Sequence, residues 1–367
     1  MQGRSTQSSG RNRQVDDREA VEERYRLDTQ IWLTALLATL FASVCATGAW
    51  ARGWLNRDGA LAAFLLGWLV YFAGTWGASF TLLFFFVTAS AWSALAEGSG
   101  PGSGLDHNAG PNPDTVASPD HGAAAGDGPA PARHQKPVRN PRPARDPSPA
   151  LKPSPRRNAR QVLANGLVAA LACLAGHIAR TLSPSLTRPD LVAVAAWVAF
   201  TAALAEATAD TWASELGRRF GGRPRRLTDF RPVPPGTSGA ISPVGTLAAL
   251  AGASLLTLVS VELALAGLFP FLPAPAFAIV AGKAAVSASV SGFAGTLVDS
   301  WLGSRWQAVY HCDHCGVDTE KAFHRCGKSA RLYRGLHWLD NDMVNLLSTV
   351  FATVLGLVSV FPFFTKL

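Results

Sequence analysis

The chain alternates between long apolar runs and shorter polar stretches. Most of the apolar runs carry no charged face at helical spacing, and they lie at 31–50, 59–75, 78–95, 161–179, 191–209, 243–269, 273–303 and 344–364. A helix of about 20 apolar residues crosses the hydrocarbon core of a bilayer, so each run is about the length of one spanning helix. The pattern predicts an all-α fold, a polytopic integral membrane helical bundle with about seven or eight transmembrane helices.

Composition favours this interpretation over a large soluble helical bundle. The 367 residues are 48% hydrophobic and only 16% charged, and a soluble bundle needs charged faces that these runs lack. The run at 31–50 is too long for the core of a signal peptide, and the acidic residues before it are unlike a transit peptide. We expect a multi-pass protein of the lipid bilayer, with the plastid envelope and the endoplasmic reticulum as the membranes considered.

The polar stretches divide the chain into four regions. Residues 1–30 are predicted to be a disordered polar N-terminus, and 31–96 an N-terminal transmembrane unit. Residues 97–159 are rich in Pro, Gly and Ala and cannot bury enough apolar surface to offset the entropy of ordering, which predicts a disordered loop. Residues 160–367 form a C-terminal transmembrane unit that includes a Cys/His loop at 304–343.

The net charge of +8 indicates how the chain is oriented in the membrane rather than a nucleic-acid partner. With eight spans, most Lys and Arg residues fall in loops on one face, which the positive-inside rule assigns to the cytoplasm or its organellar equivalent. No motif that reads RNA or DNA accompanies them, so no nucleic acid is expected as a partner. The polar motifs of the C-terminal unit all fall on this same face, where we expect a site.

Acidic residues near the ends of two spans are the first site candidates. Asp210 and Glu215 lie at the end of one predicted span, and Asp299 lies near the end of another. Carboxylates at such positions are costly unless they pair, reach water or bind a cation. Their alternative role is to cap a helix at the headgroup layer.

Around Asp299, small residues recur at helical spacing. Gly292, Gly295 and Gly303 share one stripe, which would let another helix approach closely. Helix packing explains the glycines as well as a ligand does. It does not explain Asp299 and Ser300, which remain site candidates.

A basic, glycine-rich loop precedes the run at 243–269. It supplies backbone N–H groups and hydroxyls at a helix N-terminus, where an anion is favoured, through Gly236, Thr237, Ser238 and Gly239. Among the arginines before it, Arg225 and Arg226 are predicted phosphate contacts, since guanidinium groups suit phosphate. The alternative is a positive-inside loop that ends in a turn, and no Walker-type sequence is present.

Amides accompany the acids. Asn341 and Asn345 share one face at the start of the last span, and Asn165 enters the span at 161–179. Such groups can orient phosphates, while carboxylates hold Mg²⁺ together with substrate phosphate. The Mg²⁺ candidates are Asp210, Asp299 and Asp342.

The Cys/His loop contains a second possible metal site. Cys312 and Cys315 form a C-x-x-C, and His324 and Cys326 follow closely, a four-ligand set suited to structural Zn²⁺. The alternative is reduced thiols without a metal.

Five ordered stretches together resemble the transmembrane protein 19 family, which includes the phytyl-phosphate kinase of tocopherol biosynthesis. They are RQVLANG at 160–166, ADTWASELG at 209–217, the loop at 236–246, GTLVDS at 295–300 and NDMVN at 341–345. The cysteine pattern also looks like the family's loop, whereas the insertion at 97–155 departs from it. The resemblance covers 156–365 well and 31–96 loosely.

The resemblance implies an enzyme, a membrane-embedded isoprenyl-phosphate kinase, with phytyl-phosphate kinase as the specific case. It would transfer a phosphoryl group from a nucleoside triphosphate, CTP or ATP with Mg²⁺, to an isoprenyl phosphate substrate. Asp210, Glu215, Asp299, Asn341 and Asn345 are then the expected catalytic residues. Two other classes stay open: a membrane transporter of a polar or anionic substrate, and a zinc-stabilised membrane scaffold.

Overall fold

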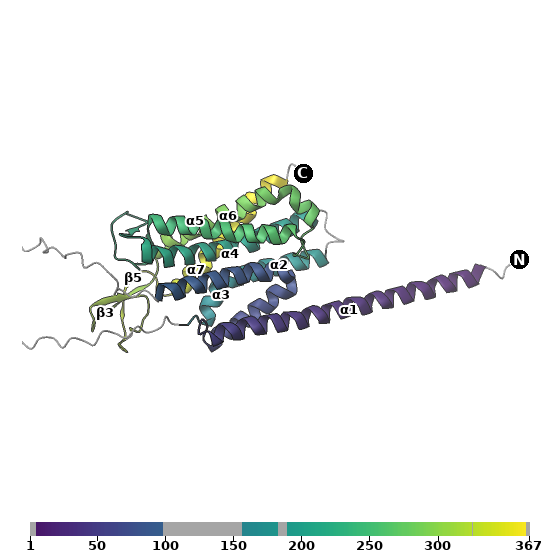
Figure 1. The fold of residues 1–367 in the computed structure, drawn as a ribbon, viewed down its shortest axis with the longest axis horizontal. Coiled ribbons are helices and arrows are strands. Elements are labelled where there is room, and N and C mark those ends of the chain that lie inside the picture. The colour runs from purple at the N-terminus through teal and green to yellow at the C-terminus, as the bar shows by residue number, and fades with distance from the viewer. Residues whose placement is uncertain (1–4, 98–155, 183–188, 325, 365–367) are drawn as a thin grey trace, which may run out of the picture. The chain divides into compact units, whose positions relative to one another are not determined.

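The structure, a computed structural model, describes residues 5–97, 156–182, 189–324 and 326–364 (Figure 1). Its helices are α1 (Ser5–Ala51), α2 (Arg57–Glu97), α3 (Ala159–Thr181), α4 (Pro189–Phe220), α5 (Pro243–Leu265), α6 (Ala274–Arg305) and α7 (Asn341–Phe364). Within this described part, seven helices are long and apolar enough to cross a membrane. The predicted all-α, multi-pass integral membrane fold is therefore confirmed.

Helix α2 combines two of the predicted spans by folding back on itself. Its 41 residues would extend about 60 Å if straight, about twice the thickness of the hydrocarbon core. Thr75 interrupts it with φ 48° and ψ −138°. Both ends of the hairpin reach Arg157, because the Asn56 amide donates to the Arg157 carbonyl (3.1 Å) and the Arg157 guanidinium lies 3.5 Å from Ser93 Oγ. The two halves account for two apolar runs, which is why the eight predicted runs correspond to seven helices.

The turn at Thr75 is held by the connection between α5 and α6. Thr75 Oγ1 and the Gly77 amide both donate to the Leu268 carbonyl, at 3.1 and 2.9 Å. A Cβ on Gly77 would lie 2.5 Å from the Phe269 ring, so only glycine lets this turn pack so closely. The positive φ of Thr75 is thus imposed by its tertiary surroundings.

Helix α4 is the centre of the bundle and contacts α3, α5, α6 and α7. Residues 201–209 are buried without interruption, and alanines along the helix let its neighbours approach closely. Trp197 and Phe200 fill the wider spaces, where Trp197 meets Phe277 edge-on with ring centroids 4.7 Å apart.

Two small antiparallel sheets accompany the helices. In the first, β1 (Arg225–Arg226) pairs with β2 (Ala240–Ile241) ahead of α5. In the second, the order is β4-β3-β5, with β3 (Val309–Cys312) between β4 (Val317–Thr319) and β5 (Arg331–Arg334). This second sheet occupies the Cys/His loop between α6 and α7.

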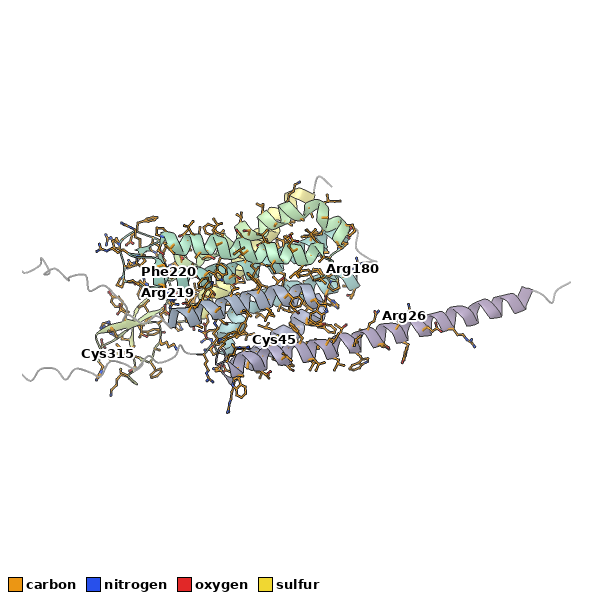
Figure 2. The ribbon with its side chains drawn as sticks, in the orientation of Figure 1. Arg26, Cys45, Arg180, Arg219, Phe220 and Cys315 are labelled. Atoms are coloured by element: carbon orange, nitrogen blue, oxygen red, sulfur yellow. The ribbon has the colours of Figure 1, made fainter. Side chains whose placement is uncertain are left out.

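At one end of the bundle, α3, α5 and α7 begin and α4 and α6 end. We call this end of the bundle the polar end. Hydrogen bonds between Arg160 and Asp340 and between Ser238 and Gly303 join these helix ends. Arg219 and Cys315 lie toward this end, and Arg180 lies at the opposite one (Figure 2). The single-face arrangement expected from eight spans therefore holds in space.

One regional prediction differs from the structure, which continues α1 as a helix back to Ser5 where residues 1–30 were expected to be disordered. No proline interrupts this stretch, and pairs such as Glu22 and Arg26 have the i,i+4 spacing that supports a helix. The predicted disordered loop at 97–159 falls largely on residues 98–155, outside the described residues.

Candidate functional site

Three helices bring carboxylates together at the polar end. Ser348 on α7 donates to Glu206 Oε1 on α4 (2.7 Å) and lies 3.4 Å from Asp299 Oδ2 on α6. Thr349 donates to the second Glu206 oxygen at 2.9 Å. Asp210 lies one helical turn after Glu206 on α4. Within the described ranges, none of these three acids has an ion pair, so the cluster suits a cation.

Amides connect this cluster to α3. The Asn345 side chain lies 3.2 Å from the Asn165 amide oxygen. With its nitrogen turned toward α6, it donates to Asp299 Oδ2 (3.2 Å) and to the Asn341 carbonyl (3.0 Å). Asn345 therefore orients Asp299, as expected for a polar orienter.

Two arginines border the cluster through ion pairs. Arg218 pairs with Glu215 at 2.7 Å, and Ser93 of the α2 hairpin donates to the other Glu215 oxygen at 2.9 Å. Arg160 lies 2.8 Å from Asp340 Oδ2 and 3.8 Å from Asp342 Oδ2. Asp342 is thus partly neutralised and is a weaker Mg²⁺ candidate than Asp210 or Asp299.

The glycine-rich loop lies directly on the end of α6. Gly239 has φ +73°, and a Cβ there would lie 2.2 Å from the Ser304 amide and 2.5 Å from the Ser300 carbonyl. Ser238 Oγ donates to Gln307 Oε1 (2.6 Å), and Gln307 Nε2 donates to Glu320 Oε1 (3.2 Å). This chain of hydrogen bonds links the loop to the Cys/His loop.

These elements surround a cavity of about 780 Å³ at the polar end. We call it the polar cavity. The predicted site residues that line it are Asn165, Asp210, Glu215, Gly236, Thr237, Ser238, Gly239, Asp299, Ser300, Asn341, Asp342 and Asn345. Sequence stretches up to 180 residues apart therefore meet around one space.

Two predicted phosphate contacts, Arg225 and Arg226, do not line this cavity. Arg225 donates instead to the Phe230 carbonyl at 2.9 Å, and Arg226 lies 3.4 Å from Asp229. Pairing of β1 with β2 fixes both residues in a sheet whose turn supplies their partners. The sequence marks this loop as basic but does not say which guanidinium groups turn inward.

Other residues of the polar cavity were missed. The basic ones are Arg157, Arg160, Arg218 and Lys321, and the others include Gln161, Gln307, Tyr310, Glu320 and His337. Burial raises the pKa of Glu320 above its usual value. Arg160 begins the RQVLANG stretch and Arg157 lies three residues before it, which is the one signal that could have found them. Glu320, Lys321 and Gln307 carry no motif.

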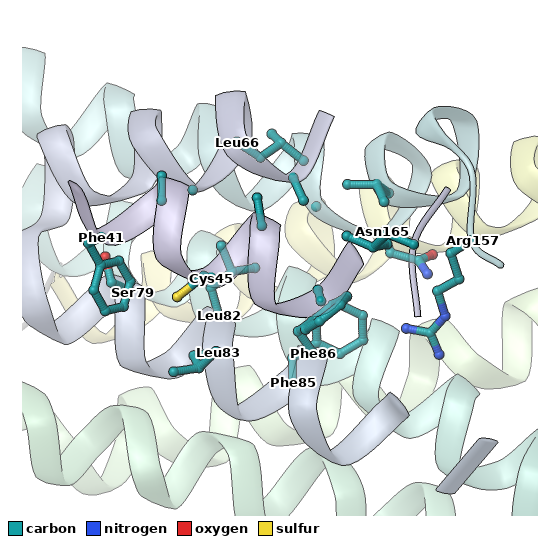
Figure 3. Close-up of a pocket in the computed structure, with 18 of the residues that line it drawn as sticks. Phe41, Cys45, Leu66, Ser79, Leu82, Leu83, Phe85, Phe86, Arg157 and Asn165 are labelled. Atoms are coloured by element: carbon teal, nitrogen blue, oxygen red, sulfur yellow. The ribbon is translucent and has the colours of Figure 1, made fainter. Parts of the chain in front are cut away.

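An apolar crevice of about 90 Å³ lies between α1, both halves of α2 and α3 (Figure 3). Phe41 and Ser79 lie at one end, and Asn165 and Arg157 lie at the other. Between them the lining is almost wholly apolar and includes Ala42, Cys45, Ala46, Ala49, Leu55, Ala63, Leu66, Gly67, Leu82, Leu83, Phe85, Phe86, Val162 and Gly166. Three residues, Arg157, Gln161 and Asn165, line both the crevice and the polar cavity.

The predicted zinc ligands converge in the Cys/His loop. The ligand atoms of Cys312, Cys315, His324 and Cys326 all lie within 4.8 Å of one another. The Cys312 and Cys326 sulfurs are 3.7 Å apart, and His324 Nδ1 is 3.2 Å from Cys326 Sγ. A hydrogen bond with His324 lowers the pKa of Cys326 to about 6, which favours the thiolate that binds metals.

Comparison with known families agrees with this architecture. The family described as integral membrane protein DUF92 matches residues 16–109 and 143–353. The chain belongs to this family. The match covers all seven helices in whole or part, including every helix that contributes to the polar cavity.

Two curated relatives of this DUF92 member are similar over part of their length. Protein PGR of Arabidopsis thaliana is 33% identical over 155 residues, which are 42% of this chain and 51% of the relative. An uncharacterized membrane protein of Methanocaldococcus jannaschii is 28% identical over 200 residues, 54% of this chain and 61% of the relative. The chain thus spans between half and two thirds of the relatives it matches, and no solved structure matches it.

Proposed function

We propose that this protein is an isoprenyl-phosphate kinase that converts a membrane-borne prenyl monophosphate into the diphosphate at the polar end. The resemblance of its motifs to the transmembrane protein 19 family, which includes phytyl-phosphate kinase, supports this reaction class. Neither the family description nor the names of the two relatives specify an activity. The proposal therefore depends chiefly on the geometry.

The observation that carries the proposal is that the apolar crevice and the polar cavity adjoin, with three residues lining both. A ligand that fills both must have a hydrocarbon tail and a polar, charged head. Arg157, Gln161 and Asn165 lie at the junction, where the phosphate of such an amphiphile would meet a guanidinium and two amides. A prenyl phosphate has this form.

The acid cluster fits Mg²⁺, because buried carboxylates without paired cations favour a hard divalent ion. Asp210 and Asp299 would hold it, with Asn345 orienting Asp299 and Ser348 placed between Asp299 and Glu206. When bound, Mg²⁺ would neutralise phosphate charge and orient the triphosphate. The CTP or ATP phosphates would otherwise repel these acids.

The transfer itself needs positioning more than covalent chemistry. An oxygen of the prenyl monophosphate attacks the γ-phosphorus, a new P–O bond forms, and the bond from that phosphorus to the β,γ-bridging oxygen breaks. The nucleoside diphosphate leaves with the electron pair. Because a phosphate monoester is largely dianionic at neutral pH, the attacking oxygen needs no catalytic base.

The basic groups of the polar cavity would bind the phosphates of the substrates. Arg218, anchored by Glu215, and Arg160, anchored by Asp340, would contact the phosphates, as would the backbone N–H groups of the loop at 236–239. Arginine suits this role since its guanidinium binds two phosphate oxygens at once.

The test is an assay of the purified full-length protein in nanodiscs. It would be incubated with Mg²⁺, CTP or ATP, and phytyl, geranylgeranyl or farnesyl monophosphate, and the prenyl diphosphate measured by mass spectrometry. We expect diphosphate from at least one pair of substrates, dependent on Mg²⁺. Folded protein that forms none from any pair would refute the kinase, and substrate uptake into liposomes would then favour a transporter.

A further inference from the structure

The Cys/His loop has too little core to hold its shape by burial. Its three strands are short, and large apolar side chains of the sheet remain accessible, with Val317 43%, Leu332 40% and Tyr333 66% exposed. Small units of this kind usually need a disulfide or a metal to be stable. All five cysteines are free, which leaves the thiols of this loop available to a metal.

Two tight turns present the four ligands. In the first, the amides of Cys315 and Gly316 donate to the Cys312 carbonyl at 3.2 and 2.8 Å, with Gly316 at φ +67°. In the second, the Gly327 amide donates to the His324 carbonyl at 2.9 Å. Each turn supplies two ligands. Cys312 and Cys315 have the C-x-x-C spacing of structural zinc sites, and His324 and Cys326 are two residues apart.

The distances match tetrahedral zinc. With Zn–S bonds of about 2.3 Å, two thiolates on a tetrahedral ion lie about 3.8 Å apart. The Cys312 and Cys326 sulfurs are 3.7 Å apart, and the full set of ligand atoms lies within 4.8 Å. Cys312 is buried while Cys315 is exposed, so the site lies at the surface of the loop.

The segment between the two turns reaches the polar cavity. It runs from 316 to 323, contains β4 and continues into Glu320, Lys321 and Ala322, which line the cavity. We call residues 316–323 the strap. Its two ends adjoin the two ligand pairs, so one metal would fix both ends.

We propose that Cys312, Cys315, His324 and Cys326 bind one Zn²⁺, and that this ion closes the strap into a fixed loop that holds Lys321 at the polar cavity. Gln307 supports the same geometry by donating to Glu320 at 3.2 Å. Lys321 has no ion pair within the described ranges, so its ammonium is available to an anionic ligand. The role of Lys321 as a phosphate contact rests on the proposed kinase function, whereas the zinc site does not.

The zinc site is tested by metal analysis of the purified full-length protein. We expect one zinc per chain, and release of one zinc when a mercurial blocks the thiols in the presence of a chromogenic chelator. The exposed ligand variants Cys315→Ser and Cys326→Ser should lose it, whereas Cys45→Ala, outside the loop, should keep it. Wild-type protein without zinc, even after purification in zinc-supplemented buffer, would overturn the proposal.

The strap is tested by hydrogen exchange on wild-type protein before and after zinc removal. We expect exchange in residues 316–323 to rise at least about tenfold, the signature of lost local structure, while the helices α4 to α7 stay unchanged. Unchanged exchange in the strap would show that zinc does not hold it. This measurement needs no turnover, so it stands even if the kinase proposal fails.

Lys321 is tested by titrating CTP and ATP, with Mg²⁺, into protein in nanodiscs. Lys321→Ala should weaken nucleotide binding about tenfold, Lys321→Arg should restore most of it, and Arg331→Ala on exposed β5 should have no effect. If Lys321→Ala binds both nucleotides as well as wild type, Lys321 is not a phosphate contact. If wild type binds neither nucleotide, the kinase proposal fails as well. Zinc content and hydrogen exchange still test whether zinc holds the strap in place.

Discussion

The two sides of the bundle are packed in different ways. In α4, 83% of the most apolar 18-residue stretch is buried, and the helix lies directly against glycines of α6, with Ala205 beside Gly292 and Glu206 beside Gly295. In α1, only 17% of the corresponding stretch is buried, and the neighbouring α2 hairpin is rich in large aromatic side chains. Close packing fixes charged groups in place, and loose packing leaves room for a hydrocarbon. In the proposed kinase, α4, α6 and α7 would therefore hold the phosphates, and α1, α2 and α3 would hold the prenyl tail.

The sharpest test of the tightly packed side is the substitution Asp299→Asn. It keeps the shape and hydrogen bonds of the side chain but removes the charge that would hold Mg²⁺, so kcat/KM for diphosphate formation should fall about 10²–10³-fold. Glu262→Gln on α5, an exposed acid outside the polar cavity, is the matched control. Equal activity of the two variants would remove the acid cluster from the mechanism.

Two arginine substitutions compare a residue that lines the polar cavity with a residue of β1 that does not. Arg218→Met should raise the KM for the triphosphate or the prenyl phosphate about 10- to 100-fold, since a charge-assisted hydrogen bond contributes about 1.5–3 kcal/mol. Arg225→Met, whose guanidinium donates to the Phe230 carbonyl outside the cavity, should leave steady-state kinetics unchanged. A larger effect at Arg225 would mean that the β1–β2 loop moves onto the substrate.

The loosely packed side is probed by filling the crevice. Ala42→Phe should lower kcat/KM for a twenty-carbon prenyl phosphate about tenfold, with a smaller effect on a five-carbon one, because the bulky ring takes the place of the tail. Val44→Phe, 71% exposed on the same helix, is the control. Prenyl phosphate should also protect Cys45 from maleimide, read by mass spectrometry. Unprotected Cys45 and an unaltered chain-length preference would place the tail elsewhere.

The smallest expected effect concerns packing between helices. A Cβ on Gly295 would lie 2.6 Å from Glu206 Cγ and 2.9 Å from Ala352 Cβ, whereas a Cβ on Gly282 would meet nothing within 4 Å. Gly295→Ala should therefore destabilise the protein by about 1–3 kcal/mol, and Gly282→Ala should be neutral. Thermal unfolding in detergent measures both, and similar midpoints would argue against a tight contact of α6 with α4.

Much of the site could be predicted because its residue types are out of place in apolar spans. Asp210, Asp299 and Asn345 are conspicuous because burying a carboxylate or an amide in the membrane is costly unless it has a partner or a function. The sequence did not show that Arg225 and Arg226 lie outside the polar cavity, because a basic loop looks the same whether its guanidinium groups turn inward or to solvent. Lys321 and Gln307 were missed because their role depends on how the Cys/His loop folds back over α6.

By itself, the sequence predicted a multi-pass membrane fold with about seven or eight spans, and most of the motif residues that line the polar end. Those features follow from local hydrophobicity and length, which the bilayer enforces on each segment separately. Only the tertiary structure decided that α2 is a hairpin, which acids share Ser348, and that the crevice and the polar cavity share lining residues. These features depend on contacts between residues far apart in the chain, such as Asn165 and Asn345, and no local pattern records them.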